Sequence, residues 1–108
     1  CDGNLGASVT KEGTLIPKKP LDSISINECS FIKIDAEGDE VTILDGAKDT
    51  ILYFKPVMLI ESNKCALENK NTSQAELKKT IQALGYDVSM IPNQDPEHCD
   101  LLCIPNKK

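Results

Sequence analysis

The chain has 108 residues, a length that suits one small domain with a single hydrophobic core. Its 17 acidic residues outnumber the 12 basic ones, and the net charge of −5 disfavours nonspecific binding to nucleic acids or anionic membranes, which require a basic surface. No apolar run approaches the roughly 20 residues of a membrane-spanning helix. We therefore expect a soluble protein with no nucleic-acid partner and no membrane partner.

The amino-terminal part carries weak structural signals. Residues 1–13 show little periodicity and predict an irregular segment. The glycine-rich stretch at 2–7 lacks the preceding strand that a nucleotide-binding loop requires. Residues 14–16 predict a short strand ending at Pro17, and residues 20–24 predict a brief helical turn.

Residues 31–34 give the clearest strand signal, and acidic side chains follow it at once. The sequence Phe-Ile-Lys-Ile alternates apolar side chains and then gives way to acids around Gly38. Glycine permits a sharp turn from a strand into a helix. Ligands of open α/β sheets bind at the carboxyl ends of the strands, so this segment predicts a binding site.

A second strand signal, residues 57–60, follows a predicted helix. Apolar residues at helical spacing predict that helix over residues 41–51, and Pro56 ends the pattern. Two apolar strands joined by a helix are typical of a parallel sheet that is covered on both faces. The second strand ends in Glu61, so we expect both acidic strand ends to face one crevice.

The remaining segments predict a loop, a helix and a hairpin. Residues 62–72 are polar and predict a loop, either one that covers the crevice or a plain surface connection. Ser73 begins a capping box for a helix that ends at Gly85. The alternating residues 86–91 and the apolar residues 99–104 predict a terminal antiparallel hairpin.

The cysteine pattern favours reduced thiols. The chain has five cysteines, an odd number without a CxxC pair, which we interpret as buried thiols in a reducing, cytoplasmic compartment. His98 with Cys99 and Cys103 lacks the paired spacing of a zinc site, and a solvent-exposed histidine is favoured. The first residue is Cys1 instead of methionine, which is consistent with a processed or partial product.

Taken in order, these segments resemble the carboxyl-terminal half of FkbM-type methyltransferases. The similarity covers about residues 20–104, and the runs that carry it are PLDSI at 20–24, FIKIDAEGDE at 31–40, ILDGA at 43–47, KPVMLIE at 55–61 and LGY at 84–86. The resemblance implies an α/β fold with a partial Rossmann-like sheet, mostly parallel, and a carboxyl-terminal antiparallel hairpin. It implies a single domain over residues 1–108, in which residues 1–19 are an irregular lead-in.

The resemblance also implies a function. S-adenosylmethionine would be the cofactor, and the methyl group would pass to a hydroxyl of a small natural product or saccharide. Members of this family carry a glycine-rich cofactor loop and a ribose-binding acid ahead of the matched region. A βαβ unit needs roughly 30 residues, more than residues 1–19 provide. We therefore expect the chain to represent the substrate-side half and to be inactive by itself.

The candidate site residues are carboxylates at strand ends. Asp35 and Glu37 are candidate catalytic groups that orient the acceptor or take its proton, with helix capping and dipole compensation as structural alternatives. Glu61 and Glu40 are candidate ligands of substrate or metal, although dipole compensation is favoured for Glu40. Mg²⁺ is a second candidate cofactor, because Asp35, Glu37 and Glu61 would suit it if they converge.

A different class of function is a non-catalytic interaction or scaffold module. A half-sheet leaves one strand edge unpaired, and such edges pair with other chains. A homodimer is the expected state under this interpretation.

Overall fold

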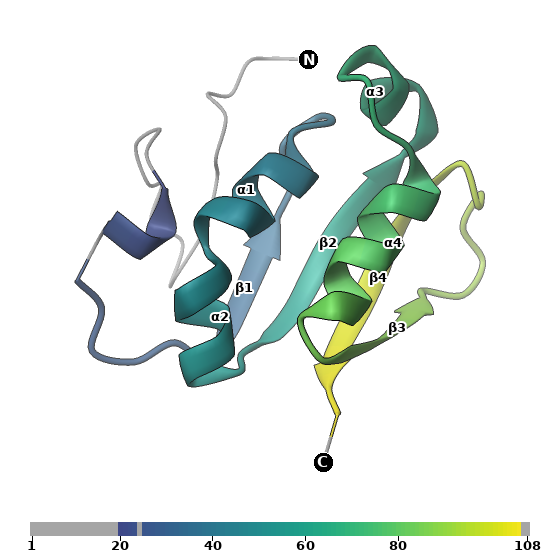
Figure 1. Ribbon diagram of the computed structural model, residues 1–108. Coiled ribbons are helices and arrows are strands. Elements are labelled where there is room, and N and C mark those ends of the chain that lie inside the picture. Colours follow the sequence, from purple (N-terminus) through teal and green to yellow (C-terminus); the bar gives the residue numbers. More distant parts are fainter. Residues whose placement is uncertain (1–19, 24, 107–108) are drawn as a thin grey trace.

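A computed structural model of the protein describes residues 20–23 and 25–106. The elements expected within residues 1–17 lie outside this part of the chain. A short 3-10 helix, η1, covers Leu21–Ser23 and confirms the brief helical turn that the sequence predicts there. The strands and helices that follow are β1 Phe31–Ile34, α1 Glu40–Gly46, α2 Lys48–Phe54, β2 Val57–Asn63, α3 Lys64–Asn69, α4 Gln74–Ala83, β3 Tyr86–Met90 and β4 His98–Pro105 (Figure 1).

The four strands form one sheet in the order β1-β2-β4-β3. β1 and β2 are parallel, whereas β4 is antiparallel to both of its neighbours. β1, β2 and β3 therefore run in one direction and β4 in the other. This confirms the α/β class and the terminal hairpin. It also places the amino end of β4 beside the carboxyl end of β2.

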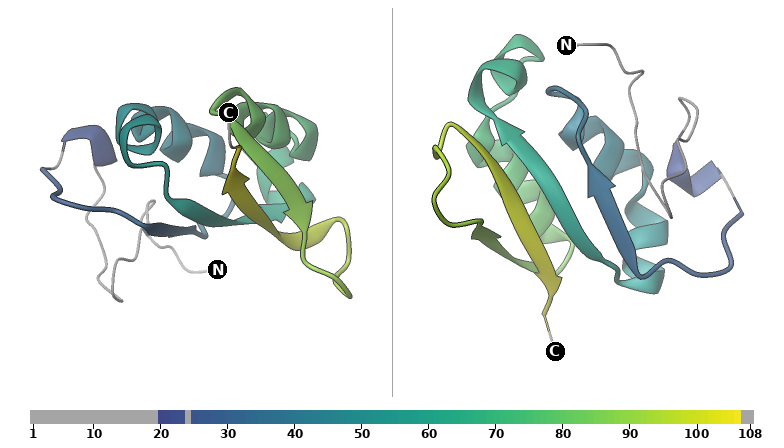
Figure 2. Two further views of the ribbon diagram at one scale, coloured as in Figure 1. Left: turned by 90° about the horizontal axis from the view of Figure 1, so that it is seen from below. Right: turned by 180° about the vertical axis from the view of Figure 1, so that it is seen from behind.

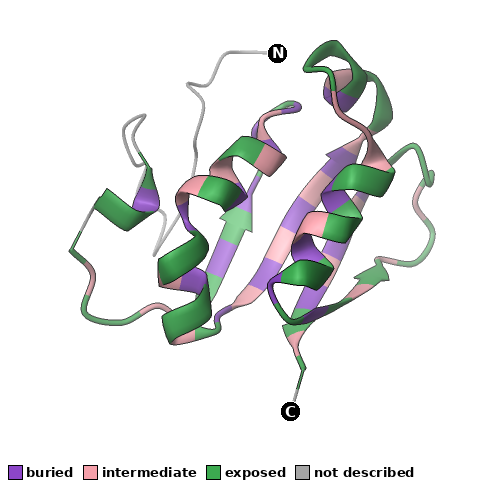
Figure 3. Cartoon of the chain, in the orientation of Figure 1, coloured by how far each residue is buried: buried purple, intermediate pink, exposed green. Residues whose placement is uncertain are grey.

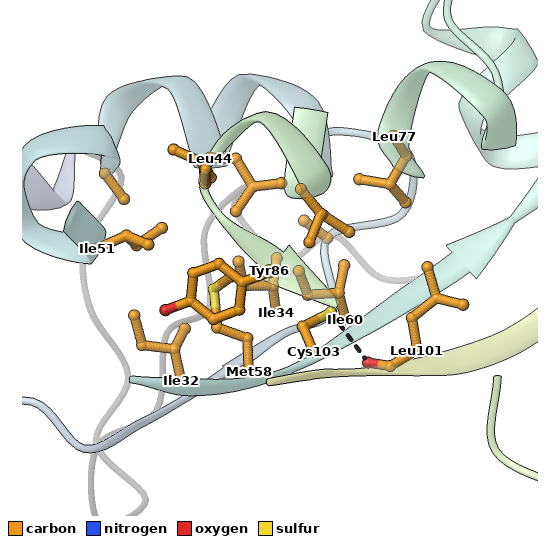
Figure 4. Packing of buried hydrophobic residues seen from close by; sticks show 14 of the residues in the cluster. Ile32, Ile34, Leu44, Ile51, Met58, Ile60, Leu77, Tyr86, Leu101 and Cys103 are labelled. Atoms are coloured by element: carbon orange, nitrogen blue, oxygen red, sulfur yellow. Dashed lines mark hydrogen bonds between the residues drawn. The ribbon is translucent and has the colours of Figure 1, made fainter. Parts of the chain in front are cut away.

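The helices α1, α2 and α4 lie on one face of the sheet (Figure 2). Burial alternates along β2, with every second side chain buried, because successive side chains of a strand point to opposite faces (Figure 3). Apolar side chains from the sheet and the helices meet in the core shown in Figure 4. The strands contribute Ile32, Ile34, Met58, Ile60, Leu101 and Cys103, and the helices contribute Leu44, Ile51, Leu67, Leu77 and Ile81.

The described cysteines differ in how far their side chains are buried. Cys99 and Cys103 are buried, as expected, whereas Cys65 on α3 is exposed. The Sγ of Cys103 donates to the carbonyl of Leu101 at 3.6 Å, and that of Cys99 donates to the carbonyl of Pro96 at 3.6 Å. No helix in the described part of the chain is both long and apolar enough to cross a membrane.

The prediction of one continuous helix over residues 41–51 was wrong, because the structure has two helices there. α1 ends at Gly46, and Ala47 separates it from α2. The carboxylate of Asp22 accepts the backbone N–H groups of Asp49 at 3.0 Å and Thr50 at 2.8 Å. These bonds serve the unpaired amides at the start of α2, so a residue outside the helix stabilises the break.

The prediction of a loop over residues 62–72 was wrong. β2 continues to Asn63, so Glu61 lies inside the strand and not after it. α3 follows directly, because the side chain of Asn63 accepts the backbone N–H of Ala66 at 3.1 Å and caps the helix. The capping of α4 was predicted, and the Ser73 hydroxyl accepts the N–H of Glu76 at 3.1 Å.

Gly38 makes the turn between β1 and α1 possible. Its φ of +101° lies in the region that side chains other than glycine rarely adopt. A Cβ at this position would also overlap the carbonyl oxygen of Ala66 on α3. The turn and the helix that packs on it therefore both depend on glycine.

We expect Gly38→Ala to lower the free energy of unfolding by about 3 kcal/mol or more, because it adds steric overlap to an unfavourable φ. Gly85→Ala is the matched control, since Gly85 has a similar φ of +90° but a Cβ added there would meet no heavy atom within 4 Å. That variant should cost about 1 kcal/mol. Urea unfolding followed by circular dichroism measures both, and equal losses would contradict a tight contact with α3.

Candidate functional site

The parallel pairing of β1 and β2 brings the predicted acids together. Ile34 pairs with Ile60, so Asp35 and Glu61, the next residue of each strand segment, lie side by side at the carboxyl ends. Carboxylate oxygens of Asp35, Glu37 and Glu61 all lie within 4.8 Å of one another. Asp35 and Glu37 are exposed and Glu61 is half-buried. We call these three residues the acidic cluster.

β4 adds a histidine that the sequence did not predict for the site. Glu61 lies opposite Asp100 in the antiparallel register, and His98 is two residues before Asp100 on the same face. The Nε2 of His98 is 2.9 Å from Oε2 of Glu61. The expectation that the imidazole is exposed is confirmed, at 58% side-chain exposure. No local pattern indicates the contact, because it depends on which strand pairs with β2.

Glu40 does not join the acidic cluster. It is the first residue of α1 and only 1% exposed. Its Oε2 accepts the backbone N–H of Ala36 at 2.9 Å, and its Oε1 accepts that of Gly38 at 2.9 Å. Both oxygens therefore hold the turn that carries Asp35 and Glu37. These contacts support a role of Glu40 in positioning that turn instead of its candidate role as a ligand of substrate or metal.

The neighbours of the acidic cluster perturb two protonation equilibria. Burial, followed by a hydrogen bond with Asp35, raises the pKa of Glu61 to about 7, while the bond from His98 acts in the opposite direction. The pKa of His98 is raised, chiefly by its bond to Glu61. Glu61 is therefore poised to gain or lose a proton near neutral pH.

The contact of Glu61 with His98 competes with binding of Mg²⁺ by the acidic cluster. Three convergent carboxylates are a possible cation site. However, Oε2 of Glu61 already pairs with His98, and the raised pKa of His98 favours an imidazolium whose positive charge opposes a second cation.

Contacts between elements fix the segments around the acidic cluster. Lys70 directly follows α3, and its Nζ lies 3.4 Å from a carboxylate oxygen of Asp39 in the β1–α1 turn. The side-chain amide of Gln74 donates to the hydroxyl of Ser62 at 2.9 Å and to the carbonyl of Pro96 at 2.8 Å. The carboxyl end of β2 is thereby tied both to α4 and to the loop before β4.

Comparison with known proteins identifies the family. The profile of the "Methyltransferase FkbM domain" matches residues 3–88, most of the chain. The chain belongs to the FkbM methyltransferase family. No curated protein matches the sequence.

One solved structure shares the fold of this FkbM-family chain. It is the crystal structure of methyltransferase FkbM from Methylobacillus flagellatus KT, with 21% sequence identity and a TM-score of 0.57. The similarity covers 96% of this chain but only 27% of that one. The family match ends at residue 88, so β4 and His98 lie beyond it.

We expect Glu40→Ala to lower the free energy of unfolding by about 2–4 kcal/mol, because two buried N–H groups lose their acceptor. Glu40→Gln should cost less, since the amide oxygen can still accept one of them. Glu68→Ala is the control, because Glu68 is exposed and forms only a surface pair with Lys64. Urea unfolding measures all three, and a Glu40→Ala value close to that of the control would contradict the role of Glu40.

Proposed function

We propose that this chain contributes the acceptor side of an S-adenosylmethionine-dependent O-methyltransferase. The acceptor in this proposal is a hydroxyl of a small natural product or saccharide. The convergence of Asp35 and Glu37, which follow β1, with Glu61 of the neighbouring strand β2 carries the proposal. Membership of the FkbM methyltransferase family supports the reaction class.

Methyl transfer from a sulfonium is an in-line displacement. The protein must align the acceptor oxygen with the methyl carbon and remove the hydroxyl proton. Glu61, with a pKa of about 7, suits the role of proton acceptor at neutral pH. Asp35 and Glu37 are exposed beside it and would accept hydrogen bonds from other hydroxyls of the acceptor.

The methyl donor requires a binding site of its own. The matched solved structure has a much longer chain, of which this one corresponds to 27%. In this proposal, S-adenosylmethionine binds mainly to residues other than the acidic cluster, and the cluster faces the acceptor. Activity should therefore be assayed in the protein at its full natural length.

We expect Glu61→Gln to lower kcat by about 100-fold or more, because general-base catalysis contributes at least that factor. Asp35→Asn should lower the rate less, because it weakens only the alignment of the acceptor. The assay follows labelled methyl transfer from S-adenosylmethionine to a panel of mono- and disaccharides. Glu68→Gln on the exposed face of α3 is the control and should leave the rate unchanged.

Two results would contradict this assignment. Unaltered rates in both cluster variants would show that neither Glu61 nor Asp35 takes part in the reaction. Loss of activity in EDTA, with recovery on adding Mg²⁺, would assign the acidic cluster to a cation instead of a proton.

A second candidate function is self-association as an interaction module. Phe31 is 46% exposed and Ile104 is 42% exposed on the sheet face opposite the helices. β1 is also an outer strand of the described sheet. Exposed apolar side chains beside an outer strand suit pairing with a second copy of this chain.

If this candidate is correct, light scattering should give twice the 11.8-kDa chain mass, and Phe31→Glu should restore the monomer by placing a charge in the interface. Tyr53→Glu is the control, because Tyr53 is 80% exposed on α2, away from that face. A monomeric wild-type chain, or equal effects of the two variants, would contradict self-association through the sheet.

A further inference from the structure

We propose that His98 is a positioning residue for Glu61 in methyl transfer, holding one carboxylate oxygen so that Glu61 is kept in its proton-accepting form. The inference rests on the proposed function and assigns a role to a residue outside the family match. His98 acts through Glu61 and need not touch the acceptor.

The geometry supports a directional contact. β4 runs antiparallel to β2, which lets His98 reach Glu61 diagonally across the strands, with Nε2 2.9 Å from Oε2. Asp35 lies on the other flank of Glu61, directly after β1. The Glu61 side chain is 17% exposed, whereas His98 is 58% exposed. An exposed ion pair contributes little to stability, but the orientation of a base affects catalysis strongly.

The surrounding charges give His98 a second effect. Asp35 from the end of β1, Glu37 from the turn and Glu40 from α1 are acids close to Glu61, and the charges of Asp35 and Glu40 disfavour a negative charge on it. Asp95 and Asp100 face His98 and, with Glu61, favour its positive charge. The imidazolium therefore opposes the acids around Glu61 and lowers its pKa.

The reaction step balances without a further reactant. As the acceptor oxygen bonds to the methyl carbon, the carbon–sulfur bond breaks and its electron pair stays on sulfur, which becomes a neutral thioether. The hydroxyl proton passes to Glu61 and later to solvent. His98 contributes a hydrogen bond throughout.

The contact can be tested directly, because His98 is the only histidine of the chain. We expect the pKa of His98, measured by NMR titration of its ring protons, to lie above the ordinary value. Glu61→Gln should lower it, since the carboxylate that favours the imidazolium is gone. An ordinary value in the wild type, unchanged by Glu61→Gln, would overturn the proposal.

The catalytic role is tested by pH profiles of kcat in the full-length protein, with the labelled methyl-transfer assay. The rate should rise with pH as Glu61 loses its proton. In His98→Ala and His98→Gln, this rise should move to higher pH by about one unit, because the imidazolium no longer favours the carboxylate. His98→Gln keeps a hydrogen-bond donor, so its kcat should reach the wild-type plateau at high pH. The plateau kcat of His98→Ala should be lower by about tenfold or more. The acceptor KM should change by no more than about twofold in either variant.

The outcomes separate this inference from the proposed function. An active wild type whose profile is unchanged in both variants would overturn the role of His98 and leave the proposed function intact. An inactive wild type that still shows the raised pKa of His98 would overturn the proposed function, and the positioning role with it. Glu97→Gln, an exposed neighbour, controls for general disturbance of the loop before β4.

Discussion

The parallel pairing of β1 with β2 is the constraint on which the rest of the site depends. The Ile34–Ile60 register places Asp35 and Glu61 side by side toward the carboxyl ends of the two strands. A shift by one residue would turn every side chain of a strand to the other face. The apolar side chains of the core therefore fix the positions of the acids as well.

The turn after β1 is held from two sides. Glu40 binds two of its backbone N–H groups from the first turn of α1, and α3 approaches Gly38 closely enough to exclude a side chain. A buried carboxylate with both oxygens bonded is a stiff support, because breaking either bond leaves a buried donor without a partner. The turn that carries Asp35 and Glu37 is thereby held in one conformation.

The cluster concentrates negative charge on a chain that is already acidic. Burial disfavours a negative charge on Glu61, the hydrogen bond with Asp35 and repulsion by its carboxylate add to this effect, and the pKa of Glu61 is raised to about 7. His98 from β4 offsets part of that repulsion. A partly buried acid with an acidic neighbour and a histidine contact is the kind of group that can exchange a proton near neutral pH, as the proposed function requires.

Local patterns in the sequence determined the strands β1 to β4, the helix α4 and its Ser73 cap, because periodicity and capping depend on residues close along the chain. They also placed Asp35 directly after β1, and parallel pairing made its approach to Glu61 predictable, although β2 continues two residues beyond Glu61. Only the tertiary structure decided the break before α2, where Asp22 bonds a residue 27 positions away, and the contact of His98 with Glu61, 37 positions away. The first contact depends on the packing of η1 against α2 and the second on strand order and register, which no short stretch of sequence encodes.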